Sequence, residues 1–171
     1  MFKVDIVTDV ASELVTLSNV KDHLAITHTD DDTYLTSLIT VVRKQTEAYC
    51  GISIGEQERA WIIDALGYDE LKVPYGPVIS VDDVKEKTDY GTYESLVLYT
   101  AYDYDNGLFV PFYNGRYKVE FTAGYTTLPA NLKHGMLVQI AYLYENRNEG
   151  TVGFCDEAKD LVAHFRDMTW M

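Results

Sequence analysis

Carboxylates are the side chains of this sequence that could most readily do chemistry. The 171 residues include 27 Asp or Glu against 14 Lys or Arg, which gives a formal net charge of −13. Asp30, Asp31 and Asp32 stand together, and hard divalent cations prefer carboxylate oxygens. The triplet also lies directly before a helical pattern, where carboxylates can accept free backbone amides and meet the positive end of the helix dipole. Helix capping therefore explains the triplet better than a metal site.

Other patterns that could hold a metal or cofactor are also weak. The segment Asp103–Gly107 has the acidic start of a calcium loop, but Gly107 stands where such a loop needs Asp or Asn, and the later glutamate is missing. Asn and Gly tolerate positive φ, so the same residues are typical of a hairpin turn. The histidines show no zinc-helix spacing. The four are His23, His28, His134 and His164. We expect the protein to hold no metal and no cofactor.

The two cysteines, Cys50 and Cys155, are too few for a disulfide framework and favour free thiols in a reducing compartment. A Cys–His nucleophile pair forms only in the fold, so Cys50 stays open as a nucleophile, although buried cysteine at an apolar helix end is common. Nucleophile-elbow, Walker and dinucleotide motifs are absent from the sequence. The residues therefore predict a protein that is not an enzyme, with a small acidic hydrolase as a remote alternative.

The charge balance limits the classes of partner. An acidic surface repels phosphate backbones, so we expect neither specific DNA binding nor docking to an anionic membrane. The longest apolar run, Met136 to Tyr144, is too short to span a bilayer, and Asp5 and Asp9 interrupt any signal peptide. The 14 tyrosines are equally consistent with a protein interface and with a β-rich segment.

Helical spacing of apolar residues marks the N-terminal part of the chain. We expect a short helix at Leu17–Leu24, capped by Thr16 or Ser18, and a long helix at about Asp31–Tyr49, closed by Gly51. The apolar stripe of the long helix consists of Leu35, Leu38, Ile39, Val42 and Tyr49.

Two more helices are predicted after Pro129. The first covers about Leu132–Tyr144 and contains Gly135, which costs about 1 kcal/mol relative to alanine inside a helix. Close approach of another helix would compensate this cost, and we predict that the approaching helix is the one at Asp31–Tyr49. The last amphipathic stretch has an apolar face formed by Phe154, Ala158, Leu161, Val162 and Phe165.

The region between about Glu56 and Gly124 has the short β-branched and aromatic runs that are typical of strands. Asp105-Asn106-Gly107 and Asn114-Gly115 predict hairpin turns. Prolines favour strand edges and loop boundaries, and three of the four fall here, at Pro74, Pro77 and Pro111. The candidate strands are residues 58–66, 70–74, 78–85, 95–104, 108–112 and 116–124.

These elements predict an α+β fold in which an antiparallel β unit is inserted into a small helical bundle. Residues 1–55 would supply the N-terminal helices, residues 56–124 the β unit, and residues 125–171 the helices that complete the bundle. The flanking helices must bury their apolar stripes on one another, which makes this the simplest arrangement.

Several short motifs occur in an order that resembles the head–tail connector family of tailed bacteriophages, also called head-completion or adaptor proteins. A leucine-led helix at Leu17–Leu24 precedes an Asp-rich entry into a long helix that ends in Tyr-x-Gly at Tyr49–Gly51. A Pro-Val-Ile-Ser-Val segment, an Ala-Gly-Tyr strand end and a helix that closes in Tyr-Glu-Asn-Arg follow. These are residues 77–81, 123–125 and 144–147. The resemblance covers about Leu14 to Asn148.

The resemblance implies a structural role without catalysis. Such proteins form a ring beneath the portal protein after DNA packaging, extend the DNA channel and provide a platform for the tail or the stopper. The implied partners are the portal, neighbouring neck proteins and further copies of this chain, while DNA passes through without specific binding. The implied location is the neck of the virion, assembled in the cytoplasm of a host bacterium. A neck protein that binds a tail terminator is the alternative.

The C-terminal stretch is the candidate assembly interface. The family often ends in a leucine pair followed by Tyr-Arg, which this chain matches only loosely. An aromatic residue near a chain end is a common interface anchor. We predict that this stretch docks on a neighbouring subunit or on the portal, and the alternative is that it folds back on the chain's own helices. The interface candidates are Phe154, Leu161, Phe165 and Trp170.

Overall fold

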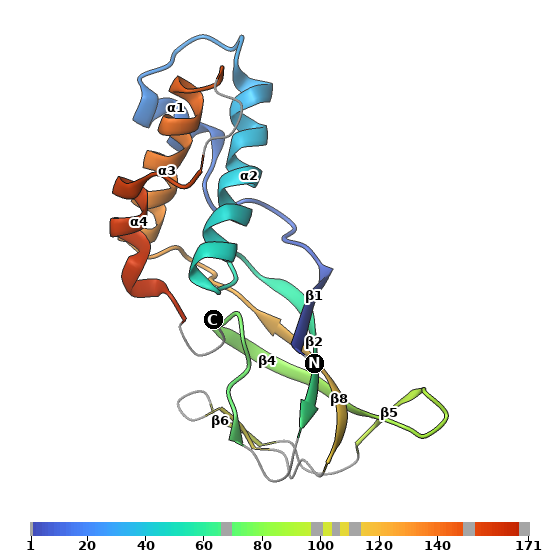
Figure 1. The fold of residues 1–171 in the computed structure, drawn as a ribbon. Helices are drawn as coiled ribbons and strands as arrows, with labels where there is room; N and C mark the ends of the chain where they lie inside the picture. Colours follow the sequence, from blue (N-terminus) through green and yellow to red (C-terminus); the bar gives the residue numbers. More distant parts are fainter. Residues whose placement is uncertain are drawn as a thin grey trace.

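Helices and strands occupy opposite ends of the molecule (Figure 1). The structure is a computed structural model that describes residues 2–65, 70–96, 101–103, 107–109, 114–148 and 153–167. Helices α1 to α4 form one end, which we call the helical half, and the strands form the other, which we call the β half. The expected α+β class is therefore confirmed.

The helices begin and end where local signals place them. Helix α1, Leu17–Leu24, starts with a capping box in which Thr16 and Asn19 exchange side-chain and backbone hydrogen bonds. Helix α2, Asp32–Cys50, ends at Gly51, whose φ of 68° is the left-handed cap that glycine adopts without strain. The remaining helices are α3, Ala130–Glu145, and α4, Asp156–Val162, which continues into the short 3-10 helix η1, Ala163–Phe165.

Two antiparallel sheets make up the β half. The five-stranded sheet has the order β1-β2-β8-β4-β5, so β8 lies between β2 and β4 although it comes last in the chain. Its strands are β1 Phe2–Thr8, β2 Gln57–Ala65, β4 Val78–Lys87, β5 Tyr93–Ser95 and β8 Gly115–Ala123. The three-stranded sheet has the order β3-β7-β6, with β3 Glu70–Leu71, β6 Ala101–Asp103 and β7 Gly107–Phe109.

The structure corrects three expectations about the strands. Residues 2–8 belong to the expected N-terminal helical segment but form edge strand β1, because Phe2, Val4 and Ile6 alternate with charged residues and β2 offers a free edge. Asn114-Gly115 does not join a hairpin, since β7 and β8 pair with strands of different sheets. The single strand expected at 95–104 is divided between β5 and β6.

Other expectations about the β half hold or lie outside the described residues. Strand β8 alternates as its sequence predicts, with four buried side chains on one face. Asp103 pairs with Gly107, so β6 and β7 form the hairpin expected there, although Asp105 and Asn106 themselves lie outside the described residues, as does Pro111.

Each half has its own apolar core. The helical core includes Leu35, Val42, Leu132, Met136 and Ile140, all fully or nearly fully buried. The β core is centred on one face of the large sheet and includes Trp61, Val73, Val84, Tyr117, Val119 and Phe121. Because the two clusters are separate, a further set of interactions must hold the halves together.

Gly135 lies at a close helix contact, but the partner differs from the predicted one. Helix α3 packs against both α2 and α4. A Cβ atom built on Gly135 would lie 2.6 Å from Val162 Cγ1 and 3.3 Å from Leu161 Cβ, both of α4. The close approach is therefore to α4, because the apolar stripe of α3 faces α2 while Gly135 lies on the side that α4 covers.

Replacing Gly135 with leucine is expected to lower the free energy of unfolding by about 1–3 kcal/mol, because the added atoms collide with Val162 and force the helices apart. Gly153→Leu is the matched control, since no heavy atom lies within 4 Å of a Cβ at Gly153. Urea denaturation of both variants measures the difference. A Gly135→Leu variant as stable as the control would contradict this packing.

Candidate assembly surfaces

The C-terminal segment packs on the chain's own helices. The ring of Phe154 stacks on that of Tyr49 with centroids 5.2 Å apart, and Leu161 and Phe165 are half-buried against the helical core. Trp170, the fourth candidate, lies outside the described residues. Phe154 and Phe165 therefore pack on the chain's own helices, as the alternative expectation has it. Docking through the part of their surface that stays exposed remains a prediction.

Polar contacts also tie this segment to both halves. The backbone N–H of Asp167 donates to the Cys50 carbonyl oxygen at 2.7 Å, and the guanidinium of Arg166 lies 4.7 Å above the ring of Tyr49. Lys72, in the β half, approaches the Asp167 carboxylate to 3.0 Å. Residues 163–167 therefore form part of the folded subunit.

Arg43 is the buried centre of an ionic cluster between the two halves. It lies on α2, and its side chain is 2% exposed. Its guanidinium approaches Asp9 to 3.0 Å, Glu13 to 3.0 Å and Glu47 to 3.3 Å. Burial opposes the charge, but the hydrogen bond to Asp9 and the attraction of Glu47 and Glu13 outweigh it, so the net effect is a raised pKa of Arg43.

Glu47 carries the cluster from α2 into the β half. Its carboxylate accepts hydrogen bonds from the backbone N–H of Ile54, at 2.8 Å, and from the amide of Gln57 on β2. Arg59, also on β2, lies 3.6 Å from the same carboxylate, and its guanidinium lies 4.3 Å above the ring of Tyr75. Burial lowers the pKa of Arg59, although the Glu47 charge favours the ionised form. A single carboxylate thus joins a helix to a strand.

Sequence reasoning missed this cluster. Its local signal is the i, i+4 spacing of Arg43 and Glu47, which usually marks a solvated ion pair on a helix surface. Arg59 directly precedes the apolar run of residues 60–63 in β2, and a charge carried into a buried strand needs a partner. We call the set Asp9, Glu13, Arg43, Glu47, Gln57 and Arg59 the ionic junction.

The acidic triplet makes side-chain contacts rather than caps. Asp31 precedes α2 without a capping hydrogen bond from its side chain, which corrects the capping interpretation. Its carboxylate instead accepts a hydrogen bond from the Tyr144 hydroxyl at 2.6 Å and lies 3.5 Å from Arg147, because the end of α3 lies beside the start of α2. The Tyr144 hydrogen bond is the main cause of a lowered pKa of Asp31. Asp32 accepts from Lys21 at 2.7 Å.

Side chains suited to metal binding do not gather in the part of the chain that the structure describes. No three His, Cys, Asp or Glu residues in it converge on a point that could hold a metal ion. His23 and His134 are neighbours, with ring centroids 5.8 Å apart, a contact between α1 and α3 that their sequence spacing does not indicate. None of the described helices has the length and apolar character needed to cross a bilayer.

The Cys50 side chain is buried in the helical half. Its thiol lies 3.7 Å from the Val162 carbonyl oxygen, and burial raises the pKa of Cys50 to about 11. Burial also raises the pKa of Cys155. A thiolate is the reactive form of cysteine, so these environments oppose nucleophilic chemistry.

The chain matches one family of known proteins along most of its length. A family model described as Head completion protein matches residues 13–162. The chain belongs to the head completion protein family. No curated protein sequence matches this head completion protein.

Solved structures share its fold. A chain in the neck of an empty gene transfer agent (GTA) particle, computed with C6 symmetry, has a TM-score of 0.78 at 19% identity, with 99% of this chain and 97% of that chain covered. A chain in the virion of a native GTA particle has a TM-score of 0.74 at 18% identity, with 98% and 97% covered. A chain in the neck of a native GTA particle, computed with C12 symmetry, has a TM-score of 0.69 at 20% identity, with 99% and 97% covered.

Removing the Glu47 charge tests the ionic junction. Glu47→Gln leaves the buried guanidinium of Arg59 without an opposing carboxylate within 4 Å among the described residues, so we expect a loss of about 3–5 kcal/mol in the free energy of unfolding. The control is Glu56→Gln, a change of the same type at an exposed position nearby. Equal stability of the two variants in urea denaturation would show that the junction is not required.

The thiol environments predict slow chemical modification. At about pH 8 neither cysteine of the native protein is expected to react with a thiol reagent such as DTNB, because both are buried and the thiolate is disfavoured. Both should react at once after unfolding in urea. Rapid reaction of one thiol in the native protein would contradict this placement.

Proposed function

We propose that this head completion protein is a structural head–tail connector of the virion neck. In this role it forms a ring beneath the portal, extends the DNA channel and provides the platform for the tail or the stopper. The observation that carries the proposal is the family match over residues 13–162. The shared fold with neck chains over nearly the full length supports it.

Ring formation is proposed by analogy with the necks that share the fold. Those necks were solved with six-fold and twelve-fold symmetry. A closed ring of identical subunits needs each copy to keep one shape, because the rotation between neighbours must close on itself. The ionic junction supports such a shape, since it links α2 to β2 and to the segment that follows β1.

The charge of the chain is compatible with a conduit that does not hold DNA. The −13 net charge disfavours the counterion release on which tight DNA binding depends. The buried thiols support a non-catalytic role, and reduced cysteines are compatible with assembly in a bacterial cytoplasm.

The proposal is tested by co-purification and electron microscopy. The tagged chain is produced together with the portal protein and, separately, with the tail terminator protein of the same particle. A ring of this chain seated on the portal is the expected result. Binding to the tail terminator alone would favour the alternative neck role, and binding to neither would overturn the proposal.

The tail beyond the described residues is predicted to act in assembly. Deleting residues 168–171, with Trp170, is expected to change the free energy of unfolding by no more than about 0.5 kcal/mol and to abolish attachment to the portal. Truncation after Ala163 should abolish attachment and, unlike the shorter deletion, destabilise the fold, because it removes Phe165 and the Asp167–Cys50 hydrogen bond. Thr169→Ala is the control for the deletion. Normal attachment without residues 168–171 would remove the tail from the interface.

A further inference from the structure

The outward face of α2 is suited to cover by another protein surface. Val41 is 44% exposed, and the side chain of Lys44, one turn later, is 57% exposed. Thr36 and Ser37 already satisfy their hydroxyls on the carbonyl oxygens of Asp32 and Tyr34, at 2.8 and 2.6 Å. Covering this face therefore leaves the hydroxyl groups of Thr36 and Ser37 with their hydrogen-bond partners. Lys44 supplies a positive charge, and its ammonium group also lies 3.8 Å from the exposed carboxylate of Asp9.

A hollow of about 310 Å³ lies where α3 meets the start of α4. Its wall includes Tyr142, which is 36% exposed, and Phe154, which is half-buried. Asp156 and Glu157 provide carboxylates on the same wall. Asp156 is already paired with Lys159 at 2.8 Å, whereas no ion pair to Glu157 occurs among the described residues. The hollow thus combines apolar surface with negative charge.

Buried contacts hold the hollow in shape. Gln139 of α3 is fully buried, and its side chain accepts a hydrogen bond from the Cys155 N–H at 2.8 Å and donates to the Gly153 carbonyl oxygen at 3.1 Å. The stacking of Phe154 on Tyr49 fixes the loop from the other side. A surface that is ordered before binding loses less conformational entropy when a partner covers it.

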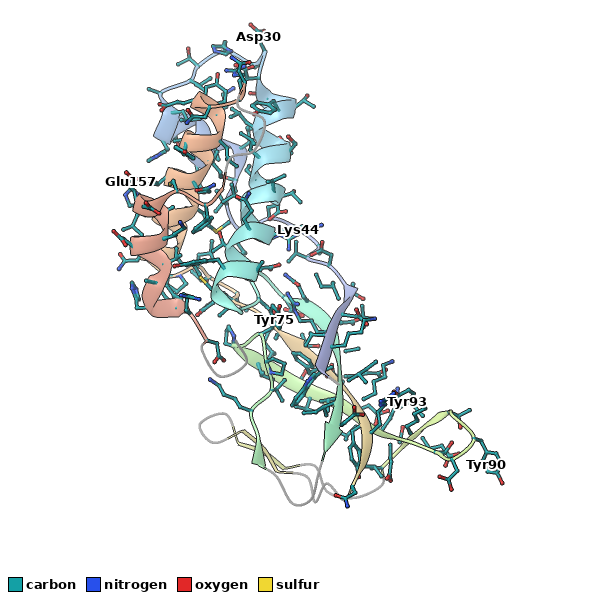
Figure 2. All side chains as sticks on the ribbon, viewed as in Figure 1. Asp30, Lys44, Tyr75, Tyr90, Tyr93 and Glu157 are labelled. Atoms are coloured by element: carbon teal, nitrogen blue, oxygen red, sulfur yellow. The ribbon has the colours of Figure 1, made fainter. Side chains whose placement is uncertain are left out.

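The two surfaces lie on opposite sides of the helical half. Figure 2 shows Lys44 and Glu157 pointing outward from the bundle in opposite directions, at similar distances along it. A ring built from one kind of subunit uses a head-to-tail contact, in which two different surfaces of the chain meet. Opposite position and opposite charge are the properties that such a pair of surfaces needs.

We infer that the occupant of the hollow is a second copy of this chain, which places the α2 face with Val41 and Lys44 against Tyr142, Phe154 and Glu157. The inference rests on the proposed ring and names the contact that closes it. Val41 and the methylene groups of Lys44 cover the aromatic wall, and the ammonium group of Lys44 pairs with the Glu157 carboxylate.

Charge reversal tests the contact. Lys44→Glu and Glu157→Lys each place like charges together, so each variant alone is expected to need at least roughly tenfold more protein to form rings. An equimolar mixture of the two variants should recover rings, because opposite charges then meet at every contact of an alternating ring. The double variant should recover them too. Assembly is measured by sedimentation and negative-stain microscopy of the chain alone and with its portal.

Lys3→Glu is the matched control, since Lys3 is 52% exposed and lies on β1, away from both surfaces. Val41→Asp, which leaves both charges in place, should weaken assembly without lowering the melting temperature. Rings of Lys44→Glu that form like those of the control would overturn the contact, as would a mixture that fails to recover assembly. If the wild-type chain forms no ring even with its portal, the proposed function fails, and this contact fails with it.

Discussion

The buried charge of Arg43 is the constraint on which the arrangement of the two halves depends. A guanidinium removed from water must be surrounded by opposite charges. Asp9 and Glu13, between β1 and α1, and Glu47 of α2 provide these charges. Glu47 in turn holds β2 through Gln57 and Arg59. Moving either half would separate at least one buried ion pair, so the cluster favours a single relative position of helices and sheet.

The ionic junction has this role because each half has its own apolar core. The helical core stabilises α1 to α4 against one another, and the β core stabilises the large sheet, but neither apolar cluster specifies how the halves join. Apolar contacts tolerate small shifts, whereas buried hydrogen-bonded charges do not. A ring subunit benefits from this property, because an error in the angle between the halves would be repeated at every contact of the ring.

The C-terminal segment has two roles that share the same residues. Phe154 and Phe165 are partly buried on the chain's own helices, and Asp167 connects the segment to Cys50 and Lys72. The same anchoring shapes the hollow beside α4. Stability of the subunit and the form of its docking surface therefore depend on common contacts, which is why an assembly variant must be shown to be folded before its effect is interpreted.

The sequence by itself determined the features that depend on neighbouring residues. Periodic apolar residues located α2 and α3, Thr16 and Gly51 marked helix ends, and alternation from Tyr117 to Ala123 predicted the buried face of β8. The apolar faces of the C-terminal candidates were also visible in this way. Such patterns reflect hydrogen bonding and packing within one element, so they can be read before the fold is known.

Only the tertiary structure decided which elements meet. The glycine of α3 indicated a close approach, but the choice of α4 over α2 depended on how three helices pack together. The carboxylate of Asp31 accepts a hydrogen bond from Tyr144, which is 113 positions away, instead of capping its own helix. Arg43 is buried among ion-pair partners that include Glu13 and Asp9, 30 and 34 positions away. The spacing of residues along the chain does not indicate these partners, because each contact contributes its energy only after folding has brought distant residues together.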